Sequence, residues 1–158
     1  MAVYTLERVQ QLPISLEEAW TFFSSPANLK VITPSEMDFN ILSGEHWVKT
    51  MYAGQIIAYT VRPLWNISMY WMTEITQVRE KEYFIDEQRS GPYALWHHQH
   101  HFRPAPGGVE MIDLLHYKLP LGWLGDLAHV LFVRRRIEDI FNYRQRVLEK
   151  RFGTMAGS

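Results

Sequence analysis

The chain has 158 residues, a length that suits one domain, since domains typically contain roughly 100–150 residues. Hydrophobic residues make up 47% of the chain and charged residues 21%, which excludes an intrinsically disordered composition. The formal net charge of −1 argues against attraction to nucleic acid or anionic membranes, and the absence of cysteine excludes disulfides and thiolate metal ligands. Aromatic residues make up 14%, which raises the question of what these rings do in so small a domain.

No run in the sequence approaches about 18 consecutive apolar residues, the length expected of a membrane-spanning helix. The first ten residues also lack the apolar core of a secretory signal. We therefore expect a cytoplasmic protein that has no nucleic-acid partner and does not insert into a membrane. We further expect residues 1–152 to form a single domain, followed by a tail over residues 153–158.

The first expected elements are a strand and two short helices. Residues 3–12 are rich in β-forming side chains and predict a strand. Ser15, followed three residues later by Glu18, forms a capping box that predicts the start of a helix. Pro26 favours a second short helix through residues 28–32.

Short runs rich in aromatic and β-branched residues begin near residue 38, with turn residues between them. They predict six consecutive strands with short connections, which is typical of an antiparallel meander. The expected strands cover residues 38–43, 53–62, 68–79, 83–90, 94–103 and 108–118. Residues 63–67 place apolar side chains at a hairpin tip, which we interpret as a cavity lid or a homodimer contact.

A long C-terminal helix is expected over residues 123–151, on the order of 40 Å long at about 1.5 Å per residue. Apolar residues recur on it at three- and four-residue spacing and predict one buried stripe. The stripe consists of Val130, Val133, Ile137, Ile140, Phe141 and Leu148. Residues 134–151 contain seven basic and three acidic residues, which we interpret as a solvated face, with a partner surface as the alternative. This element order predicts an α+β fold in which a curved antiparallel sheet of about seven strands packs on the long helix.

Four of the seven histidines lie between Trp96 and Phe102. Because side chains alternate along a strand, His98 and His100 share a face with these two rings and are expected to point inward. Along the strand the two histidines lie about 6–7 Å apart. The opposite face holds His97, Gln99 and His101.

Two neighbouring strands add further polar side chains to the expected inner face. Asp86 is expected on the same face of its strand as Phe84, and Asp113 on a face of its strand that is otherwise mainly apolar. A carboxylate in such a place is costly unless it is paired, so both are candidates for unusual chemistry, with His98 or His100 as partner. The other inward candidates on these strands and on the preceding one are Trp71, Phe84, Gln88, Met111 and Tyr117.

Three interpretations of His98 and His100 remain open. The pair could supply two metal ligands, with Asp113 or Glu74 as the third. It could instead orient a ligand or carry out acid–base chemistry, or it could be a hydrogen-bonded structural pair. Because no third ligand occurs at a recognisable spacing, we assign no metal and expect no cofactor.

Several blocks of the sequence resemble a bacterial subgroup of the SRPBCC (START/Bet v 1-like) superfamily. They comprise residues 12–34, 84–88, 91–93, 96–102, 113 and 117–120. The resemblance covers residues 3–152 and implies the helix-grip fold, with a hydrophobic cavity between the sheet and the C-terminal helix. The superfamily includes lipid carriers, plant hormone receptors, polyketide cyclases/dehydratases and oxygenase domains, so the resemblance implies no single function.

The expected function is binding of an apolar or aromatic small molecule, lipid- or polyketide-like, in that cavity. The expected ligand-binding residues are Trp71, Phe84, Gln88, Trp96, Phe102, Met111 and Tyr117. The main alternative is a cyclase/dehydratase-type enzyme, whose acid–base residues would be His98, His100, Asp113 and Asp86. Further alternatives are a metal enzyme on His98 and His100, and an interaction module that uses the basic helix.

Overall fold

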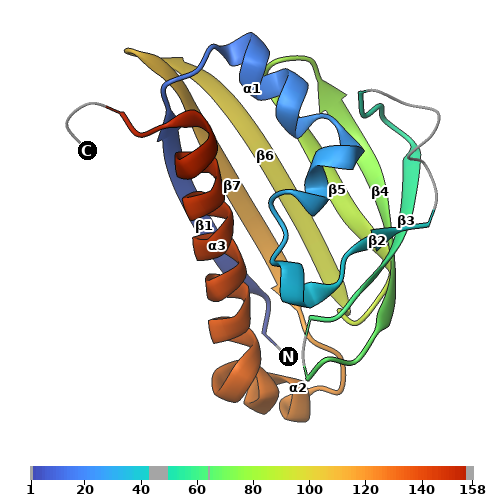
Figure 1. Ribbon diagram of the computed structural model, residues 1–158. Helices are drawn as coiled ribbons and strands as arrows, with labels where there is room; N and C mark the ends of the chain where they lie inside the picture. Colours follow the sequence, from blue (N-terminus) through green and yellow to red (C-terminus); the bar gives the residue numbers. More distant parts are fainter. Residues whose placement is uncertain (1, 43–49, 64, 156–158) are drawn as a thin grey trace.

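The computed structural model describes residues 2–42, 50–63 and 65–155. A seven-stranded sheet curves around the long helix α3, as Figure 1 shows, and every pair of neighbouring strands is antiparallel. Its strands are β1 (Tyr4–Leu12), β2 (Asn40–Ile41), β3 (Gln55–Val61), β4 (Met69–Arg79), β5 (Tyr83–Ser90), β6 (Leu95–Ala105) and β7 (Gly108–Lys118). The order across the sheet is β1-β7-β6-β5-β4-β3-β2, which confirms the predicted meander and the α+β helix-grip architecture.

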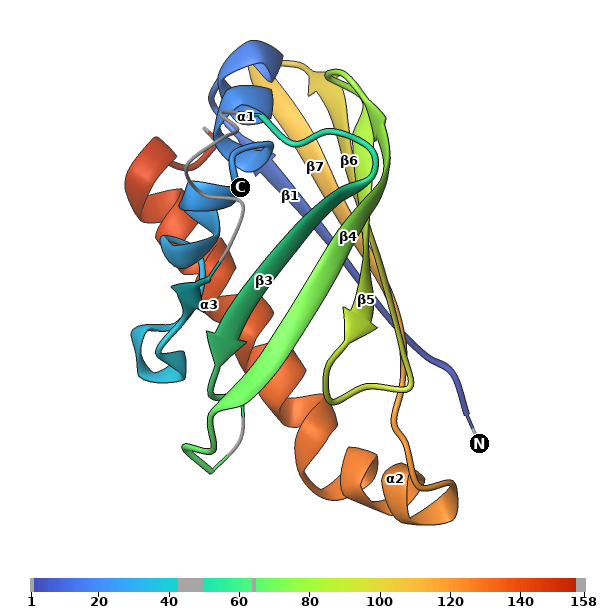
Figure 2. The same ribbon diagram turned by 90° about the vertical axis from the view of Figure 1, so that its right-hand side faces the viewer.

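The helical segments lie on the concave side of the sheet, except for α2, which lies beyond one end of the strands, as the two views in Figures 1 and 2 show. They are α1 (Leu16–Phe23), the 3-10 helices η1 (Pro26–Lys30) and η2 (Ser35–Met37), α2 (Trp123–Ala128), the π-helical turn η3 (His129–Val133) and α3 (Arg134–Phe152). Within the described residues, no helix is both long enough and apolar enough to span a membrane.

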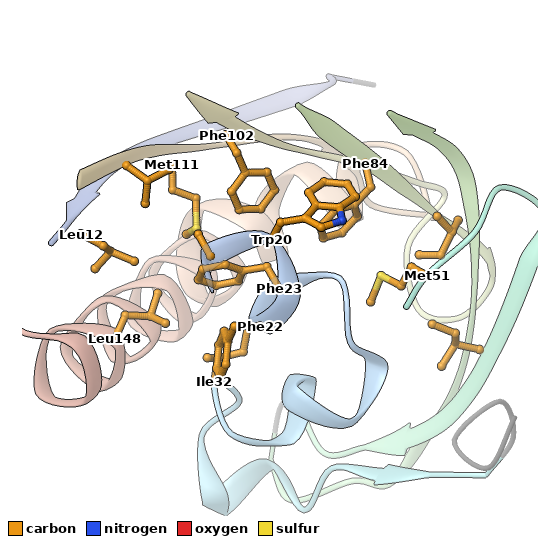
Figure 3. Packing of buried hydrophobic residues seen from close by; sticks show 14 residues of the cluster. Leu12, Trp20, Phe22, Phe23, Ile32, Met51, Phe84, Phe102, Met111 and Leu148 are labelled. Atoms are coloured by element: carbon orange, nitrogen blue, oxygen red, sulfur yellow. The ribbon is translucent and has the colours of Figure 1, made fainter. Parts of the chain in front are cut away.

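Helix α1 covers one end of the sheet and contributes four buried residues, Ala19, Trp20, Phe22 and Phe23, to the largest cluster of the core. Ser15 caps it, because the Ser15 Oγ atom accepts a hydrogen bond from the Glu18 backbone N–H at 3.1 Å, as the capping box predicts. Figure 3 shows Trp20 of this helix between two rings of the sheet, Phe84 and Phe102. Its ring centroid lies 6.2 and 5.7 Å from theirs, both in edge-on geometry that favours aromatic packing.

The strand expected at residues 38–43 is much shorter in the structure. Its first residue, Asp38, instead ends the η2 turn in a left-handed conformation with φ of 44°, and its N–H donates to Ser35 O. Only Asn40–Ile41 pairs with β3, and residue 43 lies outside the described residues. The second short helix begins at Pro26, as expected, but is a 3-10 helix that ends at Lys30.

The C-terminal helical region confirms most of the expected buried stripe, but Val130 was assigned wrongly. That side chain is 73% exposed, whereas His129 and Val133 are buried. The cause is the π-helical turn η3, in which each turn holds more residues than in an α-helix, so the inward face shifts out of the α-helical phase. Helix α3 ends at Phe152, beside Gly153 with its positive φ of 93°.

Candidate functional site

A partly open cavity of about 180 Å³ lies between the sheet and α3. Most of its wall is apolar and comes from β3, β4, β6, α3 and the segment before β2. Representative wall residues are Phe39, Ile57, Trp71, Ile75, Trp96 and Phe141. The polar part of the wall consists mainly of Asp86, His98, His100 and Arg144. An apolar pocket with a few convergent polar groups is the usual form of a small-molecule site.

Strand register brings the four predicted acid–base residues together. Asp86 on β5 lies directly opposite His98 on β6, and His100 on β6 lies directly opposite Asp113 on β7. His100 Nε2 is 2.8 Å from Asp86 Oδ2, and His98 Nε2 is 3.1 Å from Asp113 Oδ1. His100 Nδ1 approaches the same Asp113 oxygen at 2.9 Å, so the two imidazoles share both carboxylates.

A fifth member of this cluster, Arg144 on α3, was missed by the sequence reasoning. Its Nη1 atom lies 3.2 Å from Asp113 Oδ1, and its side chain is buried. The interpretation of residues 134–151 as a solvated face is therefore wrong at this position. The available signal was its spacing, because Arg144 lies in helical phase with Ile137, Phe141 and Leu148, the other buried residues of α3.

Both carboxylates of the cluster favour the ionised form. Burial alone would raise the pKa of Asp113, but the charge of Arg144 and hydrogen bonds from the two histidines hold that pKa well below the usual carboxyl value. Burial likewise opposes ionisation of Asp86, yet the hydrogen bond from His100 and the nearby positive charges lower its pKa.

The two imidazoles differ in their preference for a proton. Burial, followed by the charge of His100, lowers the pKa of His98. Burial also opposes the charged form of His100, but contacts with Asp113 and Asp86 outweigh it and raise the pKa of His100. The cluster is electrically balanced when His100 is protonated, because two carboxylates then face one imidazolium and one guanidinium.

Three of the predicted ligand-binding rings line the cavity: Trp71, Phe84 and Trp96. Phe84 also stacks on His100, with ring centroids 4.2 Å apart. The Trp71 Nε1 atom is buried and has no hydrogen-bond partner among the described residues, which leaves a free donor on a cavity-lining side chain. Tyr93 is a further lining ring that was not among the predicted ligand-binding residues.

The other predicted ligand-binding residues share the inner face of the sheet but do not line the cavity. Phe102 and Met111 are buried in the core cluster that includes α1. Tyr117 lies at the other end of β7, where its hydroxyl is 2.8 Å from His129 Nε2, and burial raises its pKa to about 12. The Gln88 amide bonds to both the N–H and the C=O of Tyr93, so it holds a turn in place.

No protein-family model and no curated protein sequence matches the chain. Solved structures do match it over almost its full length. Protein CV1439 from Chromobacterium violaceum superimposes with a TM-score of 0.71 at 10% sequence identity, covering 96% of this chain and 98% of that one. The major latex-like protein 151 of Panax ginseng gives a TM-score of 0.69 at 12% identity, covering 96% and 99%. Protein Ms6760 from Mycobacterium smegmatis gives 0.65 at 15% identity, covering 96% and 98%.

Identities this low establish the fold and leave the function open. The part of this chain that superimposes includes almost all of its curved antiparallel sheet, its short helices and its long C-terminal helix, since the matches cover 96% of it. The chain thus has the helix-grip fold that the resemblance of its sequence implies.

Proposed function

We propose that the unit formed by residues 1–152 binds a small apolar or aromatic molecule in the cavity between the sheet and α3. The observation that carries this proposal is the combination of apolar walls with a buried ionic cluster along part of the lining. A core that served only stability would gain little from this cluster, because burying charges costs free energy that pairing only partly returns.

The size of the cavity favours a compact ligand. Its volume of about 180 Å³ is close to that of an engineered apolar cavity of about 150 Å³ that binds benzene. A ligand of one or two aromatic rings therefore fits this volume better than a large lipid-like molecule, the other class that the sequence suggests. The free Trp71 Nε1 donor favours a ligand that also carries an oxygen acceptor.

The test is a cavity-filling substitution with a matched control on the same strand. Ile57 lines the cavity, and its neighbour Ile56 points to the opposite face, where it is 42% exposed. The probe is 2-naphthol, two fused aromatic rings with one hydroxyl, titrated by calorimetry. Ile57→Phe is expected to weaken binding by about tenfold or more, which corresponds to about 1.4 kcal/mol, whereas Ile56→Phe leaves it unchanged. Absence of saturable binding, or equal affinity in both variants, would refute the proposal.

The cyclase/dehydratase hypothesis depends on the same four side chains, and no comparison favours it. It requires turnover that is lost in His98→Ala or His100→Ala while the fold stays intact. Binding alone needs no such turnover, so it is the function that these observations support best.

We also propose that the expected homodimer contact lies at the end of the molecule that carries residues 63–67. Trp65 is 69% exposed. Leu121 and Trp123, which precede η3 in the sequence, are 77% and 72% exposed. The Trp65 ring lies 5.6 Å from the Phe132 ring of η3, so these apolar side chains extend across two elements. Sedimentation equilibrium should show a dimer that Trp123→Ser dissociates, and a monomer at all concentrations would contradict the proposal.

A further inference from the structure

The wall of the cavity contains three side chains with the geometry of a metal site. Asp86, His98 and His100 each present one ligand atom, and these atoms lie within 4.8 Å of one another. We propose that these three residues bind a divalent first-row transition metal ion. Two imidazoles and one carboxylate are a set that such ions, Fe²⁺ and Zn²⁺ among them, accept while keeping open positions for other ligands.

The distances between ligand atoms suit one shared ion. Metal–ligand bonds of about 2.0–2.1 Å at a tetrahedral angle place two ligand atoms roughly 3.3 Å apart. The Asp86 Oδ2 atom lies 2.8 Å from His100 Nε2 and 3.6 Å from His98 Nδ1, values that fall on either side of this spacing. The 3.6 Å separation is too long for a hydrogen bond. The lone pair of His98 Nδ1 is therefore available to a metal ion. Small side-chain rotations would bring all three atoms around one ion.

The residues behind these ligands strengthen the assignment. Histidines that bind metals usually direct their other ring nitrogen to a carboxylate, which fixes the tautomer and the ring orientation. Here His98 Nε2 is hydrogen-bonded to Asp113 Oδ1 at 3.1 Å, which fixes the orientation of the His98 ring. His100 Nδ1 lies 2.9 Å from the same oxygen but without hydrogen-bond geometry. Arg144 Nη1 also approaches this oxygen, at 3.2 Å, and so helps to hold the Asp113 carboxylate in place.

Charge also favours a cation at this position. With both imidazoles neutral, the cluster contains the carboxylates of Asp86 and Asp113 and the single positive charge of Arg144, which leaves one negative charge buried. A divalent cation bound by Asp86, His98 and His100 would compensate that negative charge. Asp86 thus supplies the third ligand that the sequence spacing did not reveal, whereas Glu74, considered for that role, pairs instead with Arg89 at 2.5 Å.

The protein ligands leave coordination positions free. Because Asp86, His98 and His100 all line the cavity, these positions are accessible from its interior, beside the rings of Trp96 and Phe84. An oxygen atom of a bound aromatic molecule could occupy one of them. This last step rests on the proposed binding function, whereas the metal site itself does not.

The test uses Co²⁺ as the probe, since its visible absorption reports imidazole and carboxylate coordination. The full chain without a polyhistidine tag is stripped of metal and titrated with Co²⁺, then with Zn²⁺, which binds such sites more tightly. The expected result is saturation at one equivalent of Co²⁺ and displacement by Zn²⁺. Absence of an absorption band at millimolar Co²⁺ would overturn the proposal.

Variants locate the ion. Asp86→Asn keeps the side-chain shape and is expected to weaken Co²⁺ binding at least about 100-fold, and Asp113→Asn about 10- to 100-fold. The matched control is His97→Ala, because His97 lies on the same strand, faces the other side of the sheet and bonds to Glu87. It should leave binding unchanged, and near-ultraviolet circular dichroism verifies that each variant is folded. Equal affinity of Asp86→Asn and the wild type, or loss of binding in His97→Ala, would overturn the proposal. These titrations contain no organic ligand, so their failure is distinguishable from failure of the cavity proposal.

Discussion

The contact between Arg144 and Asp113 predicts that a single substitution of Arg144 lowers the stability of the fold strongly. The two side chains are buried, and Arg144 Nη1 lies 3.2 Å from Asp113 Oδ1. At an effective dielectric constant of about 20, unit charges at that distance attract by about 5 kcal/mol, and their removal from water offsets part of this gain. Deleting one partner of a buried pair typically costs about 3–5 kcal/mol, because the other charge stays buried without compensation.

We therefore expect Arg144→Met to lower the free energy of unfolding by about 3–5 kcal/mol. Methionine keeps an unbranched side chain but loses the guanidinium, which also lies 5.4 Å above the Phe23 ring. Urea denaturation followed by circular dichroism measures the change. The control is Arg146→Met, an exposed position of the same helix, where we expect a change within about 0.5 kcal/mol. Equal unfolding free energies for the two variants would refute the place of Arg144 in the buried cluster.

Three further substitutions test how the fold holds this site. Ser15→Ala removes the acceptor for the Glu18 N–H and should cost about 1 kcal/mol of unfolding free energy, so an unchanged melting temperature would contradict the cap. Tyr117→Phe leaves the buried His129 Nε2 without its partner and should cost about 1–3 kcal/mol in urea denaturation, whereas a neutral result would show that this hydrogen bond contributes nothing. Leu148→Ala opens a cavity where the side chain is fully buried, with an expected cost of about 2–5 kcal/mol; a loss below about 1 kcal/mol would argue against tight packing there.

The alternation of side chains along strands was sufficient to find most of the polar cluster. His98 and His100 face inward because they share a phase with Trp96, and Asp86 and Asp113 follow from the same rule on the neighbouring strands. The period of a strand is exact enough that a face assignment survives small errors in the strand ends. Pairing of these residues was anticipated, but the distances between them depend on strand register, which a single sequence does not contain.

Alternation gives the face of a side chain but not its position along the sheet. Phe102, Met111 and Tyr117 all point inward, yet α1 covers the first two, and the third lies near η3. Whether an inward residue meets the cavity depends on which helix covers that part of the strand. That information is tertiary, so strand phase alone does not show which inward residues line the cavity.

The composition of helix α3 predicted the surroundings of Arg144 wrongly, whereas the helical phase of this residue indicates its burial. Seven basic residues over 134–151 suggested a solvated surface, and one of them, Arg144, is an essential part of the buried cluster. Its position on the apolar stripe of α3 distinguishes it from exposed neighbours such as Arg146. The π-helical turn explains the opposite error at Val130, since its departure from α-helical phase is not visible in the residue types.

Binding of an aromatic molecule in the cavity between the sheet and α3 would change the surroundings of the tryptophan indole N–H groups there. Trp71 and Trp96 line the cavity, whereas Trp65 and Trp123 do not line it and are exposed to solvent. In a titration with 2-naphthol, followed by ¹H–¹⁵N spectra assigned with single Trp→Phe variants, we expect saturable shifts of the Trp71 and Trp96 signals and unchanged Trp65 and Trp123 signals. Shifts confined to Trp65 and Trp123, or no saturable shift at all, would contradict binding in the cavity.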